Sequence, residues 1–384
     1  MRRCLRMSGM AILGTGGGGD ASITPVGAGR SAALDDHEGV EQLKIIRESG
    51  KARHKLSTSA RLSTAPPRRH PATGRTDQDP GMEEALRILR ELAWQYDGVV
   101  TRDRATSAGV SGQVWRRLVN AGKVREIARG VGLVDADRCV LSSRGRLRAG
   151  LAAYGERAVA VLHSAARLHG MRGVPPEGCV HVATPDTASR RGGPGIVAYR
   201  RRLRADEIVM VDGLPVTTPV RTLADLVPRL SPEEGLAVLD SALHLGLVRE
   251  ADLARIERAS AGRPGAGRVR PLLAIADGRA ESPLESRVRL DCVRGGVAPD
   301  ELQHEVALPG GGRARVDLAW LTGLRPVFAE ADGVDVHSRP DALYRDRARA
   351  NELALVGALV LRFTWHDTLR RGRVAGLVRR AFQS

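Results

Sequence analysis

The spacing of apolar and polar residues divides the chain into one segment without a pattern and three blocks that have one. Residues 1–80 are rich in Gly, Ser, Thr, Pro and Arg and show no sustained hydrophobic period. Such a segment buries too little apolar surface to offset the entropy lost on ordering, so we expect it to be disordered. The first helical stripe begins at Met82, and the sequence alone does not decide whether residues 1–81 belong to the native protein.

Residues 82–137 predict a small domain of helices followed by one hairpin. Thr101 is placed to cap a short helix, and Ser111 to cap a second helix whose apolar residues include Trp115. Residues 123–134 then have the pattern of a small β-hairpin. This order of elements is typical of a winged helix-turn-helix domain.

The other two blocks predict mixed α/β structure, which makes the chain a multidomain α+β protein. In residues 138–260, helical stretches precede short strands, and Ser231 with Glu234 has the spacing of a helix capping box. The glycines of residues 261–268 predict a linker between domains. Residues 269–384 predict the order helix, strand, strand, strand, helix, strand, helix.

A hairpin in the last block places acidic residues on strands. In "RARVDLAWLTGLRPVFAEADGVDVH", pairing that is symmetric about Gly323 and Leu324 sets Asp317 opposite Glu330. Like charges directly opposed across two strands are destabilising. Glu330 and Asp332 project on the same face, so we expect a cation to offset the repulsion among the three carboxylates.

Such a cluster of carboxylates is typical of a site for Mg²⁺ or Mn²⁺, which prefer oxygen ligands. The predicted helix "ESPLESRVRLDCV" adds Glu285 as a possible fourth acid. In phosphodiester hydrolysis such an ion stabilises developing charge and helps to generate hydroxide. The alternative is that the acids lie at solvated strand ends and never meet.

The overall charge points to a polyanionic partner. The net charge is +16 and the pI is near 10.9, which favours double-stranded DNA. Only four of the 60 basic residues are lysines, so we attribute part of the arginine excess to a GC-rich coding sequence. The four cysteines form no CxxC pair, and no apolar run has the length of a membrane span. We therefore expect a cytoplasmic protein that has no membrane partner.

The basic residues of the winged-helix block predict how DNA is bound. Residues 101–134 hold seven basic side chains against two acidic ones. The helix that Ser111 caps is expected to enter the major groove, while the hairpin contacts phosphates. The alternative is an adaptor domain whose charges are simply solvated. The predicted DNA-binding residues are Ser111, Gln113, Arg116 and Arg117 on the helix and Lys123, Arg125 and Arg129 on the hairpin.

Four motifs cover about the last hundred residues. "ESPLESRVRL", "RVDLAW", "FAEADGVDVH" and "YRDRARANELALVGALVLRFTW", in this order, resemble the C-terminal domain family related to very-short-patch-repair endonucleases. The resemblance implies a restriction-endonuclease-like α/β fold. It also implies that Glu285, Asp317 and Glu330 occupy the family's acidic positions, followed by Asp332 and His337. The predicted metal ligands are therefore Glu285, Asp317 and Glu330.

One departure from that superfamily affects the chemistry. Its active site usually ends in a lysine two residues after an acid, and Asp332 stands at that position. No lysine follows Lys123, and arginine cannot act as the base because it stays protonated. His337 remains a candidate to activate water, so the predicted catalytic residues are Asp317, Glu330, Asp332 and His337. Whether the protein is an enzyme stays open.

Two further resemblances concern the first two blocks. "LRELAWQYDGVVTRDRATSAGVS" and "LVNAGKVREIARGVGLV" resemble the N-terminal domain of AbiEi-type antitoxins of bacterial type IV toxin–antitoxin systems. "LHSAARLHG" and "GLPVTTPVRTLADL" are similar to the segment that follows it in AbiEi-like proteins. The resemblance implies DNA and a cognate toxin as partners. Two hypotheses follow: a DNA-binding transcriptional regulator of the antitoxin type with an appended nuclease fold, or a magnesium-dependent DNA endonuclease targeted by its winged helix.

Overall fold

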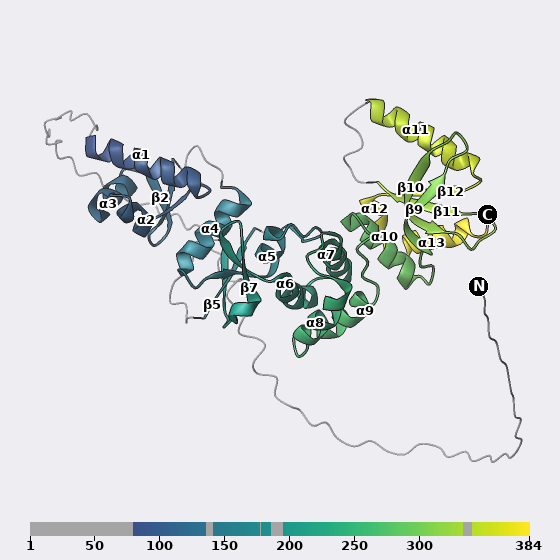
Figure 1. The fold of residues 1–384 in the computed structure, drawn as a ribbon, viewed down its shortest axis with the longest axis horizontal. Helices are drawn as coiled ribbons and strands as arrows, with labels where there is room; N and C mark the ends of the chain where they lie inside the picture. Colours follow the sequence, from purple (N-terminus) through teal and green to yellow (C-terminus); the bar gives the residue numbers. More distant parts are fainter. Residues whose placement is uncertain (1–79, 136–140, 177, 186–194, 333–339) are drawn as a thin grey trace, which may run out of the picture. The chain divides into compact units, whose positions relative to one another are not determined.

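The computed structural model describes residues 80–135, 141–176, 178–185, 195–332 and 340–384, with the side chains of 340–347 left out (Figure 1). All of these residues belong to one compact unit, Arg75–Ser384. Of the segment 1–80, for which we predict disorder, only Pro80 lies among the described residues. His337 lies outside them.

The N-terminal block, residues 80–135, packs three helices on a small antiparallel sheet. Thr101 and Ser111 cap the second and third helices as predicted, since their side chains accept the N–H groups of Arg104 and Val114. The hairpin also forms, and a third strand that the sequence did not reveal joins it, giving the order β1-β3-β2. The elements are α1 (Pro80–Gln95), β1 (Val99–Thr101), α2 (Arg102–Ser107), α3 (Gly112–Asn120), β2 (Val124–Ala128) and β3 (Val131–Val134).

Trp115 of α3 fixes the packing of this helix on the hairpin. Its side chain is buried in the core of the block. A Cβ atom at Gly132 of β3 would lie 2.5 Å from Cγ1 of Val124 and 2.9 Å from Cη2 of Trp115. Glycine therefore allows the close approach, and a larger residue at this position would push α3 away from the hairpin.

The middle block begins with a mixed sheet of five strands in the order β6-β5-β4-β8-β7. The strands near 180–184, 196–202 and 207–217 form as predicted, although the last one divides into two at a turn. The short strand β4 carries no sequence signal of its own. The elements are α4 (Ser143–Tyr154), β4 (Val159–Ala160), α5 (Leu162–Leu168), β5 (Val180–Thr184), β6 (Ile196–Arg200), a 3₁₀ turn (Ala205–Glu207), β7 (Ile208–Val211) and β8 (Leu214–Thr217).

A layer of helices completes the middle block. Thr218 caps the first of them, and Ser231 with Glu234 forms the predicted capping box on the second. The core of this layer is made of aliphatic residues such as Leu223, Leu236 and Ile256. The helices are α6 (Pro219–Leu226), α7 (Pro232–His244), α8 (Glu250–Ser260) and α9 (Val269–Leu273), with 3₁₀ turns at Val227–Arg229 and Ala266–Arg268.

The predicted linker, residues 261–268, is held against the middle block. Arg263 donates to the carbonyl oxygen of Ala259, and Arg268 donates to that of Pro228 at 3.2 Å. Val269 and Leu272 of the following helix α9 are buried in the same core as α7. The segment therefore packs as part of the middle block, which we define from here on as residues 141–275.

The C-terminal block, residues 281–384, has the predicted order of elements around a four-stranded sheet ordered β12-β11-β10-β9. β11 and β12 run parallel and the other pairs antiparallel. α10 and α13 lie on one side of this sheet and α11 on the other (Figure 1). The elements are α10 (Pro283–Arg294), β9 (Glu301–Ala307), β10 (Arg313–Trp320), β11 (Val327–Ala331), α11 (Pro340–Leu355), β12 (Leu359–Phe363), α12 (Trp365–Thr368) and α13 (Arg373–Ala381).

None of the helices in the described part of the chain is long and apolar enough to cross a membrane.

Candidate functional site

The seven predicted DNA-binding side chains all lie on the surface of the N-terminal block. Ser111 also caps α3, because its side chain accepts the N–H of Val114 at 3.3 Å. Arg116 bends back along its own helix and donates to the carbonyl oxygen of Gly112. The exposed residues are Ser111, Gln113, Arg116 and Arg117 from α3 and its cap, and Lys123, Arg125 and Arg129 from the hairpin.

The turn of the hairpin is closed by one side chain. Glu126 accepts the N–H of Gly130 at 2.5 Å, and the strand pairing shifts between Glu126 and Ala128. This contact holds Arg129 at the tip of the turn, where it is exposed. The acidic residue of the hairpin therefore shapes the turn, and the basic residues remain available to solvent.

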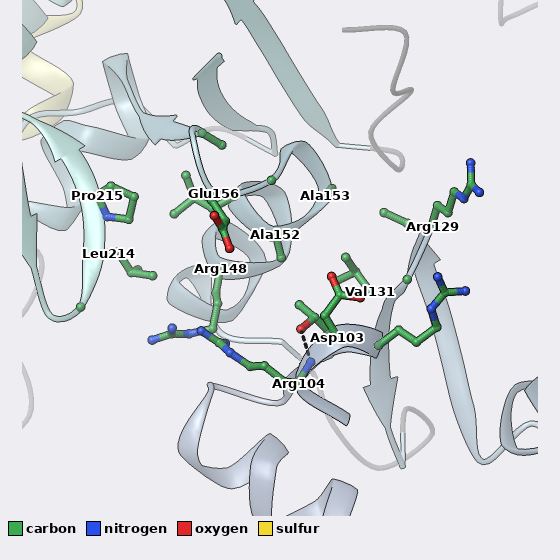
Figure 2. Close-up of a pocket in the computed structure, with 18 residues that line it drawn as sticks. Asp103, Arg104, Arg129, Val131, Arg148, Ala152, Ala153, Glu156, Leu214 and Pro215 are labelled. Carbon is green, nitrogen blue, oxygen red and sulfur yellow. Dashed lines mark hydrogen bonds between the residues drawn. The ribbon is translucent and has the colours of Figure 1, made fainter. Parts of the chain in front are cut away.

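A cavity of about 860 Å³ lies between the N-terminal block and the sheet of the middle block. Its lining combines α2, the hairpin turn, α4 and the turn between β7 and β8. Figure 2 shows Arg104 and Arg148 side by side, and both guanidinium groups lie over the ring of Tyr96, at 3.8 and 5.4 Å from its centre. Arg148 also pairs with Asp97 at 2.8 Å. The arginines at this wall therefore already have partners within the protein.

The pairing of β10 with β11 follows the predicted register. Leu318 pairs with Ala329, and Ala319 pairs with Phe328. The next position along this register sets Asp317 opposite Glu330, as the symmetric hairpin predicts. The structure offsets the repulsion between the two acids in a different way on each strand.

Asp317 and Glu285 share one amide group. Nε2 of Gln303 donates to Glu285 at 2.8 Å and to Asp317 at 3.3 Å, and the N–H of Ala331 donates to Asp317 at 2.8 Å. Burial raises the pKa of Glu285, and the charge of Asp317 raises it further. Gln303 has a φ of 52°, an uncommon backbone conformation for a residue other than glycine. Sequence reasoning missed Gln303, since a single glutamine in a strand carries no signal.

Glu330 is neutralised by arginines. Its buried carboxylate pairs with Arg349 of α11 at 2.7 Å and with Arg362 of β12 at 3.2 Å. Arg362 is the strand partner of Glu330, and it also lies 3.9 Å from Asp332. Burial raises the pKa of Glu330, and the two arginines oppose this rise. Two guanidinium groups therefore occupy the place where the sequence predicts a cation.

The predicted acids thus separate into two groups in the structure. Glu285 and Asp317 meet at Gln303, whereas Glu330 and Asp332 face arginines. Among the described residues, no group of three or more His, Cys, Asp and Glu side chains has an arrangement that could hold a metal ion. Glu285 and Asp317 share one hydrogen-bond donor, so their carboxylates lie near each other.

Comparisons with known proteins give one domain match within the middle block and two relatives that cover a larger part of the chain. Residues 158–275 match the model of the AbiEi antitoxin C-terminal domain. Two proteins of Mycobacterium tuberculosis, "Uncharacterized protein MT2308" of strain CDC 1551 / Oshkosh and "Uncharacterized protein Rv2248" of strain ATCC 25618 / H37Rv, are each 32% identical to this chain over 238 residues, which is 62% of this chain and 85% of theirs. The chain belongs to their family.

The match confirms the resemblance of the middle block to AbiEi-like proteins, and we call residues 158–275 the AbiEi domain. A solved structure, described as "Crystal structure of RV2827C protein from Mycobacterium tuberculosis", is 21% identical and covers 59% of this chain and 88% of its own, with a TM-score of 0.35. That score is too low to define the fold. The nuclease-like resemblance of the C-terminal block stays a prediction.

A buried carboxylate in the AbiEi domain forms ion pairs with three arginines. Asp225 of α6 is 1% exposed and pairs with Arg201 at 2.8 Å, with Arg221 at 2.9 Å, and with Arg263 from the segment after α8. Arg221 also pairs with Glu207 at 2.6 Å. The i,i+4 spacing of Arg221 and Asp225 within "TPVRTLADL" was a visible signal for one of these pairs. We call these five residues the Asp225 cluster.

The pH dependence of the AbiEi domain has an identifiable source in His163. Burial, reinforced by His181, Arg167 and Arg229, lowers the pKa of this imidazole from 6.5 to about 4. A lowered histidine pKa gives stability that is fully present above pH 6.5 and is lost as the pH falls toward 4. Between pH 7 and pH 5, this residue should therefore lower the free energy of unfolding of the wild type by about 2 kcal/mol.

Urea unfolding at both pH values checks this expectation. His163→Gln removes the titration, so the difference in stability between pH 7 and pH 5 should shrink by about that amount, whatever the absolute stability of the variant. His366→Gln serves as the control for loss of a histidine at an exposed position. An unchanged pH dependence in His163→Gln would contradict the assignment.

Proposed function

We propose that the protein is an antitoxin-like regulator that binds duplex DNA through its N-terminal block, folded as a winged helix. The observation that supports this most strongly is the set of seven exposed polar and basic side chains on α3 and the hairpin. Helix α3 would place Gln113 and Arg117 near base edges, while Lys123, Arg125 and Arg129 would contact phosphates. The AbiEi domain suggests a cognate toxin as the second partner.

A triple substitution tests the DNA contact. Lys123→Ala with Arg125→Ala and Arg129→Ala should weaken binding to duplex DNA about tenfold or more at moderate salt. The slope of log affinity against log salt concentration should fall by about one unit for each phosphate that the variant no longer neutralises. Fluorescence anisotropy over a salt series measures both quantities.

The matched control removes the same charge elsewhere. Arg249, Arg255 and Arg258 are exposed on and before α8, so their replacement by alanine lowers the net charge equally. This control should leave the salt slope close to that of wild type. Equal slopes in wild type and the hairpin variant would show that the hairpin does not touch DNA.

We propose, as a second function, that Glu285 and Asp317 bind Mg²⁺ or Mn²⁺ in place of the amide of Gln303. The shared donor and the raised pKa of Glu285 support this, because a cation would relieve the repulsion that the amide only reduces. In the endonuclease hypothesis the ion would supply charge stabilisation for phosphodiester hydrolysis, while Glu330 and Asp332 would stay beside Arg349 and Arg362.

Thermal unfolding with and without Mn²⁺ tests the cation site. Mn²⁺ should raise the Tm of wild type, since a ligand that binds only the folded state stabilises it. Asp317→Asn should abolish most of that rise while remaining close to neutral without the ion, because it removes a charge beside Glu285 and retains an acceptor for Ala331. Glu305→Gln on β9, which removes the charge of an exposed pair with Arg313 of β10, is the control. If both variants respond as wild type does, these carboxylates do not bind the ion.

A further inference from the structure

Helix α10 belongs to two hydrophobic cores at once. Leu284, Val288 and Cys292 form a stripe at i,i+4 spacing that is buried against the sheet of the C-terminal block. Leu290, from another face, is buried in the core of the middle block with α6, α7 and α9. Removing α10 from either core would expose the apolar surface that the helix and that core bury against each other.

A buried ion pair fastens α10 to α7. Arg289 and Asp240 have side chains that are 7% and 1% exposed, and they pair at 2.5 Å. Arg289 also donates to the carbonyl oxygen of Ile275, and Asp240 accepts the N–H of Asp277 at 2.8 Å. The pair forms only while α10 and α7 stay packed, and loss of either partner inside this joint would leave the other charge buried without a counter-charge.

The same helix organises the rest of the C-terminal block. The carboxylate of Asp291 accepts the N–H groups of Gly372, Val374 and Ala375 at 2.7, 3.0 and 3.2 Å, which caps the first turn of α13. Glu285, one turn before Arg289, reaches Gln303 of β9. A movement of α10 away from the middle block would therefore break contacts within the C-terminal block as well.

Domains joined by a small polar contact move and unfold independently, but this joint is apolar and contains a buried charge pair. We propose that α10 makes the AbiEi domain and the C-terminal block one cooperative unit, so that a ligand bound to the C-terminal block also stabilises the AbiEi domain. The claim that a ligand bound to the C-terminal block stabilises the AbiEi domain rests on the proposed cation site. The C-terminal block is then a stabilising partner of the AbiEi domain whether or not it cleaves DNA.

Native-state hydrogen exchange of the full chain tests the cooperative unit. Leu318 on β10 is fully buried in the C-terminal core. Leu318→Ala should lower the protection of the slowest amides of β10 and of α7 by the same factor, about 100-fold. Arg294→Ala, which removes a more exposed pair between Arg294 of α10 and Glu233 of α7, is the control and should change the protection of both elements by much less. Unchanged protection of α7 in Leu318→Ala would overturn the proposal.

Addition of Mn²⁺ gives a second, independent measurement. In wild type the ion should raise the protection of the α7 amides and of the β10 amides by equal factors. A rise confined to β10 would overturn the cooperative unit. If neither element responds, the proposed cation site is wrong, and the result for Leu318→Ala alone then decides whether the two domains form one unit.

Discussion

Arg289→Ala is expected to destabilise the protein by about 3–5 kcal/mol, because it leaves the carboxylate of Asp240 buried without its partner. Asp240 is 1% exposed, so water cannot replace the missing guanidinium. The carbonyl oxygen of Ile275 loses a donor at the same time. Urea unfolding at pH 7, followed by tryptophan fluorescence and by circular dichroism, measures the loss of stability.

Acidification should partly rescue this variant. Burial raises the pKa of Asp240, and Arg289 opposes that rise, so the pKa should climb further without the arginine. A carboxylate whose pKa is raised in the folded state favours folding below its unfolded pKa, and that contribution is lost as the pH rises through the folded pKa. The deficit of Arg289→Ala should therefore be smaller at pH 4.5 than at pH 7. An equal deficit at both pH values would contradict this explanation.

The double replacement Arg289→Met with Asp240→Leu is the matched comparison. Exchanging a buried ion pair for apolar residues of similar volume is often neutral or stabilising. Here the N–H of Asp277 loses its acceptor, so a residual cost of about 1 kcal/mol is expected. A double variant as unstable as Arg289→Ala would show that the ion pair is not the source of the effect.

Asp225→Ala is expected to have the second of the two largest effects. It should lower the free energy of unfolding by about 3–5 kcal/mol, because it removes the counter-charge of three arginines. Arg201, Arg221 and Arg263 come from the end of β6, from α6 and from the segment after α8, so their mutual repulsion would act on all three elements. The pKa of Arg263 is already lowered by burial, with Asp225 opposing and the neighbouring arginines adding to the effect. The segment 261–268 should detach first, and limited proteolysis with trypsin would detect cleavage after Arg268, since the bond between Arg263 and Pro264 resists trypsin.

Glu207→Gln provides the control for the Asp225 cluster. Glu207 pairs with Arg221 at 2.6 Å, on the side of that arginine away from the shared carboxylate. Its replacement removes one negative charge from the same place and should cost about 1 kcal/mol, as expected for a partly exposed pair. Equal losses in the two variants would mean that the total charge, and not the convergence of arginines on Asp225, determines stability.

The sequence by itself determined the features that depend on nearby residues. The caps at Thr101, Ser111 and Thr218 formed as expected, because a capping side chain reaches a backbone N–H only two or three residues away. The register that sets Asp317 opposite Glu330 followed from a short turn, since turn length leaves the two strands little choice of pairing. The AbiEi domain was also recognisable from its motifs.

The tertiary structure alone decided which charges meet. Glu330 is neutralised by Arg349 and Arg362, whereas Asp317 is held by Gln303 and a backbone N–H. These partners are 14 or more positions away in the chain, and no periodic pattern links residues at such separations. The same reason hid the double role of α10: its sequence shows an apolar stripe, but only the packed molecule shows that Leu290 and Arg289 are buried in a different block from Leu284 and Val288.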